Sequence, residues 1–340
     1  MERPFYFPLP EPRVLTIVHS SQVVVPQITA SSGARPRPSS AGAVTVSTLA
    51  ALRSRGEKAV FVTAYDYPTA VFADRAGVDL ILVGDSAAMT MLGHANTLSI
   101  TMTEMLVFAR AVARGAQRAF VIGDLPFLSY QVSDEEAVRN AGAFLVAGCD
   151  AVKCEGGARV AGRVRAMTNA GIAVMGHLGL TPQSIGQQGG YRVQGKTFAA
   201  VERMLDDALA LQDAGVFAIL LEALPAEAAA YVRERVDLPV YGIGAGPDVD
   251  GQLVISHDIL GNFVGDIRPK FVRRFANLDS EVVGAFRAYG AAVREGTFPA
   301  PEHCYEIDSA DEAAIRGARR GATSPGAPEP PAARLYHAHG

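Results

Sequence analysis

The fold is decided by stretches such as Leu80-Ile81-Leu82-Val83-Gly84-Asp85-Ser86, in which a short apolar run stops at an acidic residue. An apolar run without polar alternation is typical of a strand buried on both faces, as in parallel sheets. Most such runs precede a helical pattern, and eight strand–helix units over about 250 residues predict an α/β fold, the closed (β/α)8 TIM barrel. The eight runs cover residues 60–64, 80–84, 119–123, 151–155, 173–177, 218–222, 240–244 and 252–256.

The segments between the runs carry helix signals. Thr101 and Glu104 have the spacing of a capping box, which predicts the start of a helix, and Gly115 is expected to end that helix. Ser133 opens a second helix in the same way. Four glycines, each between a helix and a strand, are expected to end helices in the left-handed conformation: Gly77, Gly148, Gly171 and Gly215.

Composition divides the chain into three parts. Its 340 residues are 49% hydrophobic and 19% charged, which excludes a disulfide-stapled miniprotein and a disordered polymer. Proline-rich segments without helical or strand periodicity lie at both ends. We therefore expect a flexible N-terminal extension over residues 1–46, a catalytic barrel over 47–307 and a flexible Ala/Pro/Gly-rich tail over 308–340.

Charge and cysteine content indicate a small-molecule partner in a reducing compartment. The chain has 35 acidic and 31 basic residues, so it lacks the basic excess that nucleic-acid binding requires. No window of apolar residues is long enough to cross a membrane, and the three cysteines form no C-x-x-C pair. We expect a cytoplasmic protein that binds small substrates and contacts neither nucleic acid nor membrane.

Acidic residues end three successive runs. In a barrel the active site lies at the carboxyl ends of the strands, so Asp85, Asp124 and Glu155 are expected to converge there. Their oxygens suit Mg²⁺ or another divalent cation. The alternative is that each acid only caps a helix, although Glu is a poor cap.

The fourth run places Lys153 and Glu155 on the same side of its strand and Cys154 on the other, towards the helices. The pair would be a buried ion pair, or Lys153 would hold a substrate carboxylate beside a divalent cation. Cys154 is expected to pack in the core, because nothing around it lowers the pKa of a thiol.

His177 and Glu222 end the next two apolar runs. His177 is either a hydrogen-bonded core residue or a substrate contact at the rim. Glu222 is either a salt-bridge partner for an inward Lys or Arg, or a general base, since a carboxylate that loses water becomes a stronger base. The glycines of 242–246 lack the spacing of a dinucleotide site and predict a tight rim turn.

Several longer strings resemble the ketopantoate hydroxymethyltransferase family, and the resemblance extends over about residues 50–305. The resemblance implies a barrel of the phosphoenolpyruvate/pyruvate type, usually assembled as a homo-oligomeric decamer. The strings are Thr63-Ala64-Tyr65-Asp66-Tyr67-Pro68, Val83-Gly84-Asp85-Ser86, Asp124-Leu125-Pro126-Phe127, Val152-Lys153-Cys154-Glu155-Gly156-Gly157, Gly176-His177-Leu178-Gly179-Leu180-Thr181-Pro182-Gln183-Ser184, Gly189-Gly190-Tyr191-Arg192-Val193-Gln194-Gly195-Lys196 and Gly242-Ile243-Gly244-Ala245-Gly246-Pro247.

The resemblance also implies an activity. It is transfer of a hydroxymethyl group from 5,10-methylenetetrahydrofolate to 3-methyl-2-oxobutanoate through a Mg-stabilised enolate, giving 2-dehydropantoate (ketopantoate) for pantothenate and coenzyme A biosynthesis. By the same resemblance, Glu222 matches the catalytic base and Asp85, Asp124 and Glu155 match the metal ligands. The matched substrate-binding positions are Asp85, Ser86, Asp124, Lys153 and His177.

Two alternatives remain at this level. Another Mg-dependent 2-oxo-acid carbon–carbon lyase would normally offer a catalytic Cys in a rim loop, and the sequence shows none there. The second alternative is a paralogue that binds ligand without activity. It is suggested by Ala95, where the family usually has Asp, and by Leu128, where the family often has Gly or Met.

Overall fold

Eight parallel strands close into a barrel, each hydrogen-bonded to its neighbours in chain order, and the first pairs with the last. This computed structural model describes residues 42–265 and 269–321. The predicted TIM barrel is confirmed, and each predicted run overlaps a strand. The strands are β1 (Ala59–Thr63), β2 (Leu80–Val83), β3 (Phe120–Asp124), β4 (Ala151–Glu155), β5 (Val174–Gly179), β6 (Ala218–Glu222), β7 (Val240–Ile243) and β8 (Gly251–Val254).

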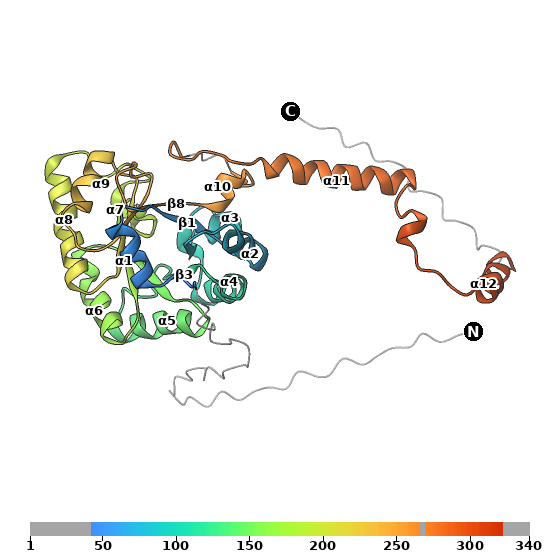
Figure 1. The fold of residues 1–340 in the computed structure, drawn as a ribbon, viewed down its shortest axis with the longest axis horizontal. Helices are drawn as coiled ribbons and strands as arrows, with labels where there is room; N and C mark the ends of the chain where they lie inside the picture. Colours follow the sequence, from blue (N-terminus) through green and yellow to red (C-terminus); the bar gives the residue numbers. More distant parts are fainter. Residues whose placement is uncertain (1–41, 266–268, 322–340) are drawn as a thin grey trace, which may run out of the picture.

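Helices surround the barrel, as Figure 1 shows. The α-helices are α1 (Val46–Ser54), α2 (Tyr67–Arg75), α3 (Ala87–Thr90), α4 (Met102–Gly115), α5 (Asp134–Val146), α6 (Ala161–Asn169), α7 (Ile185–Gln188), α8 (Phe198–Asp213), α9 (Ala226–Arg233), α10 (Ser256–Leu260), α11 (Leu278–Glu295) and α12 (Ser309–Gly321). Short 3₁₀ turns are η1 (Thr97–Ser99), η2 (Ala158–Val160), η3 (Pro182–Ser184) and η4 (Pro301–His303).

The expected helix signals act as predicted. Glu104 Oε2 accepts a hydrogen bond from the N–H of Thr101 at 2.8 Å, and the Thr101 hydroxyl accepts from the N–H of Glu104 at 3.3 Å. Ser133 caps α5 through the N–H of Glu136. All four predicted helix-ending glycines have positive φ, so each of these helices stops and the chain turns back to the next strand.

The alternation of side chains separates two apolar layers. Phe61, Leu80, Ile122 and Leu220 belong to a cluster that fills the barrel interior. Cys154 belongs to the larger cluster between strands and helices, and burial raises the pKa of its thiol to about 12. Cys154 therefore packs in the core as predicted.

The glycine-rich segment after β7 forms a turn at the rim of the barrel. Gly246 has φ of 80°, and a Cβ placed there would lie 2.4 Å from the Cβ of Ala226. A side chain at this position would therefore collide with the start of α9, which explains why the turn requires glycine.

The C-terminal part of the described chain leaves the barrel. Figure 1 shows α11 and α12 projecting away from it, and α11 buries no residue. The helix α12 lies inside the segment that we expected to be a flexible tail; residues 1–41 and 322–340, which carry most of the other expected flexible parts, lie outside the described residues. Within 42–265 and 269–321, no helix combines the length and apolar character needed to cross a membrane.

Candidate active site

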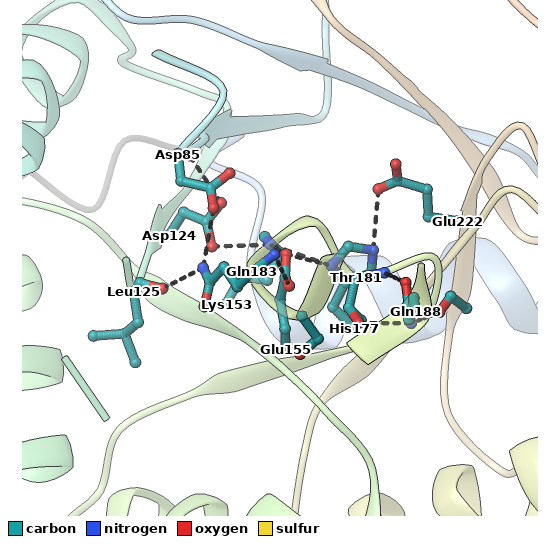
Figure 2. A network of polar contacts seen from close by, with 12 residues as sticks. Asp85, Asp124, Leu125, Lys153, Glu155, His177, Thr181, Gln183, Gln188 and Glu222 are labelled. Atoms are coloured by element: carbon teal, nitrogen blue, oxygen red, sulfur yellow. Dashed lines mark hydrogen bonds and ion pairs between the residues drawn. The ribbon is translucent and has the colours of Figure 1, made fainter. Parts of the chain in front are cut away.

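The carboxyl ends of five neighbouring strands bring the candidate residues together at one side of the barrel. A cavity of about 800 Å³ opens there. Its lining includes all seven residues that the sequence singled out: Asp85, Ser86, Asp124, Lys153, Glu155, His177 and Glu222. Figure 2 shows six of them, all but Ser86, converging on one region; Lys153 and Glu155 both come from β4.

Lys153 lies among the carboxylates. Its Nζ is 2.9 Å from Asp124 Oδ1 and 3.6 Å from Glu155 Oε1. These three side chains are at most 3% exposed. The buried ion pair that the sequence allowed is therefore present, and it includes Asp124 as well as Glu155.

The carboxylates do not act as helix caps. The N-cap of α3 is Ser86, without a capping hydrogen bond from its side chain, and Gly157 precedes η2. Asp124 instead accepts the N–H of Asp85 at 2.9 Å through Oδ2. The capping alternative is wrong for all three acids.

The buried acids exceed the positive charge around them. Burial and the neighbouring Asp124 carboxylate hold the pKa of Asp85 well above its usual range, and burial and Glu155 raise the pKa of Asp124 despite Lys153. Burial acts to raise the pKa of Glu155 too, but Lys153 and His177 hold it below its usual range. A bound divalent cation would supply the missing positive charge, and carboxylate oxygens are suitable ligands for Mg²⁺.

The acids are not arranged as a ready-made metal site. Across the described ranges, no three His, Cys, Asp or Glu side chains already form a group that could hold a metal ion. Lys153 contacts two of the three acids. The donor chemistry therefore fits a cation, while the ligands remain engaged with protein partners.

His177 connects the acid cluster to Glu222. Its Nδ1 lies 3.3 Å from Glu155 Oε1, and its Nε2 lies 3.2 Å from Glu222 Oε2. Burial and Lys153 act to lower the pKa of His177, but the two flanking carboxylates outweigh them and raise it to about 9. The partner of Glu222 is thus a histidine, and no Lys or Arg pairs with it among the described ion pairs.

This arrangement predicts a loss of stability at alkaline pH. A folded-state pKa of about 9 against an ordinary 6.5 means that protonated His177 stabilises the fold fully below about pH 6.5, and that this contribution is lost as the pH rises through about 9. In buffer without divalent cations, the unfolding midpoint should fall over this range. His177→Gln should show a shallower fall in the same thermal melts, and equal slopes would contradict the assignment.

Two polar residues of the site were missed by sequence reasoning. Gln183, in η3, donates to Asp85, and the hydroxyl of Tyr130 accepts the N–H of Glu155 at 3.0 Å. Both are buried, at 5% and 1% exposed. Neither ends a strand, so the rule that located the other residues did not reach them.

The two departures from the family pattern lie away from the cavity. Neither Ala95 nor Leu128 is among its lining residues. Leu128 is 54% exposed and has φ of 65°, in the left-handed region that favours glycine. Leu128 therefore does not line the cavity in which the candidate residues lie.

Comparison with known proteins identifies the family. The family model described as ketopantoate hydroxymethyltransferase matches residues 43–301. The chain belongs to the ketopantoate hydroxymethyltransferase family. It is 54% identical, over 74% of its length and 90% of the relative's, to the 3-methyl-2-oxobutanoate hydroxymethyltransferase of Syntrophobacter fumaroxidans. The enzyme of the same name from Syntrophomonas wolfei is 51% identical and matches 78% of this chain and 96% of its own.

A solved structure shares the barrel fold of this chain. A 2,3-dimethylmalate lyase, a PEP mutase/isocitrate lyase superfamily member, aligns with a TM-score of 0.50 over 81% of this chain and 98% of its own. The identity is 19%, so this likeness concerns the fold alone.

Proposed function

We propose that the protein transfers a hydroxymethyl group from 5,10-methylenetetrahydrofolate to 3-methyl-2-oxobutanoate, giving ketopantoate for pantothenate and coenzyme A biosynthesis. The observation that carries the proposal is the joint position of a buried acid–lysine cluster and a separate carboxylate, Glu222, in one cavity. Family membership and the names of its relatives agree with it.

The acid–lysine cluster suits a 2-oxo acid. Asp85, Asp124 and Glu155 would hold the divalent cation, Mg²⁺ by preference, which would supply Lewis-acid stabilisation of negative charge on the keto oxygen. Lys153 supplies a permanent positive charge, because the surrounding acids raise its pKa although burial opposes this. Lys153 and the Ser86 hydroxyl, which lies 2.7 Å from the hydroxyl of Tyr65, would hold the substrate carboxylate.

Glu222 is the base that we propose for removal of the proton. Carbon 3 of the substrate must lose a proton to form an enolate, and a carboxylate within reach is the usual general base. The Glu222 side chain is 17% exposed, more than the other acids, and Figure 2 shows it beyond His177, apart from them. His177 would hold this carboxylate in place and contact the substrate.

The cavity has room for a second substrate. Pockets of about 300–1,000 Å³ hold drug-sized ligands, and at about 800 Å³ this cavity far exceeds a small branched acid. The pterin-bearing folate would occupy the remaining volume and deliver its one-carbon unit to the enolate.

Deuterium exchange tests the enolate step. In D₂O with Mg²⁺ and without folate, the protein should replace the proton on carbon 3 of 3-methyl-2-oxobutanoate by deuterium. Proton NMR would follow the loss of the carbon 3 signal. Exchange should stop when the cation is chelated. Absence of exchange with Mg²⁺ present would contradict the proposed chemistry, whereas cleavage of a carbon–carbon bond would favour a lyase.

We also propose that the protein is a homo-oligomer, a decamer by family resemblance. The support is α11, whose exposed side chains include Val282, Val283, Phe286, Tyr289 and Val293. A helix with so many exposed apolar side chains is normally covered by another chain. Light scattering should show an oligomer that Phe286→Glu dissociates; a monomer in the unchanged protein would refute this.

We place the protein in the cytoplasm on two grounds. The sequence has three cysteines, an odd number, and no C-x-x-C pair, which suits a reducing compartment. Its proposed substrates are soluble metabolites.

A further inference from the structure

Gln183 is held in one orientation at the centre of the acid cluster. Its Nε2 donates to Asp85 Oδ2 at 3.0 Å and to the carbonyl of Leu125, next to Asp124, at 2.9 Å. The carbonyl of Leu125 can only accept a hydrogen bond, so the amide nitrogen of Gln183, and not its oxygen, must face it. The side chain therefore supplies both of its N–H groups to the ends of β2 and β3.

The main chain and the amide oxygen of Gln183 hold the end of β4. Its N–H donates to Glu155 Oε2 at 2.9 Å. Its Oε1 lies 3.0 Å from the hydroxyl of Tyr130, which accepts the N–H of Glu155 at 3.0 Å. One residue thus contacts two of the three candidate metal ligands and the neighbour of the third (Figure 2).

We propose that Gln183 is a positioning residue that sets the affinity of the site for its divalent cation. This rests on the proposed function, which assigns the cation to these acids. Like-charged carboxylates repel each other, and each must give up rotational freedom to become a ligand. The amide of Gln183 orients Asp85 before the cation arrives, as groups that hydrogen-bond to metal ligands do elsewhere.

The same loop contains a matched control. Gln188, at the end of α7, also has a part-buried amide that donates twice, to the carbonyl of Gly179 and to Thr181 Oγ1, each at 3.0 Å. It accepts the N–H of Thr181 at 3.2 Å. Gln188 therefore stabilises the loop without contacting any of the candidate ligands.

The test is Mn²⁺ affinity, measured by electron paramagnetic resonance on the full chain without substrate. Gln183→Met keeps the length of the side chain and the main-chain bond to Glu155, and it should weaken Mn²⁺ binding by about 10- to 100-fold. Gln188→Met should bind Mn²⁺ as the unchanged protein does. Tyr130→Phe, which loses only the hydroxyl, should weaken binding in the same direction by less and serves if Gln183→Met fails to fold.

The possible results separate the two proposals. Unchanged Mn²⁺ affinity in Gln183→Met, or in Tyr130→Phe if it replaces that variant, would overturn the role of Gln183 and leave the proposed function standing. An equal loss in Gln188→Met would also overturn it, since the effect would then belong to the whole loop. A parent protein that binds no Mn²⁺ would overturn both proposals.

Discussion

Glu222→Gln is expected to lower turnover by about 10²- to 10⁴-fold, the contribution of a positioned general base. The amide is isosteric with the carboxylate but cannot take up a proton. Glu222 also lies outside the acid cluster, and among the described ion pairs it contacts that cluster through His177, 3.2 Å away. Binding of 3-methyl-2-oxobutanoate should therefore persist while exchange of its carbon 3 proton is lost.

Two measurements distinguish this role from damage to the fold. Isothermal titration should give a similar dissociation constant for the substrate, and NMR in D₂O should show the lost exchange. Glu227→Gln is the control, because Glu227 is an exposed acid in the first turn of α9. Exchange at the unchanged rate in Glu222→Gln would remove Glu222 as the base.

Lys153→Met is expected to cause the largest loss of stability. The ammonium group contacts Asp124 and Glu155 inside the barrel, where all three side chains are almost fully buried. Removing one partner of a buried ion pair costs about 3–5 kcal/mol, because the remaining charges are left uncompensated. Urea unfolding in the absence of divalent cations should show this decrease in the free energy of unfolding.

A double variant tests the cause of that loss. Asp124→Asn in the Lys153→Met background removes one uncompensated charge, so the two changes together should destabilise less than their sum. Lys196→Met, at an exposed position, should have little effect. Strict additivity of the two buried changes would contradict the electrostatic account.

The barrel could be predicted because its strands carry their own signal. β6 is apolar until Glu222 ends it, and β4 departs from this pattern only at Lys153 before Glu155 ends it; the predicted limits of both strands agree with the structure. Alternation within β4 also placed Lys153 inward and Cys154 outward. The site residues at strand ends followed from the fold, because all parallel strands end at the same side of the barrel.

Other features depend on contacts that no local pattern encodes. Gln183 follows β5 by several residues and reaches Asp85 only because η3 folds back over the barrel end. The ammonium group of Lys153 lies closer to Asp124, on the adjacent strand, than to Glu155 on its own strand. The sequence does not show which of these two acids is the nearer partner. The apolar positions of α11 indicate a face that another surface covers. The sequence placed this helix within the expected barrel range of 47–307, whereas in the structure it projects away from the barrel.

Transfer of a labelled one-carbon unit tests the central claim most directly. The protein would be incubated with Mg²⁺, 3-methyl-2-oxobutanoate and 5,10-methylenetetrahydrofolate deuterated at the methylene carbon, and the products analysed by mass spectrometry. We expect ketopantoate that carries both deuterium atoms, formed only when all three components are present. Absence of labelled ketopantoate from the folded protein with all three present would contradict the account.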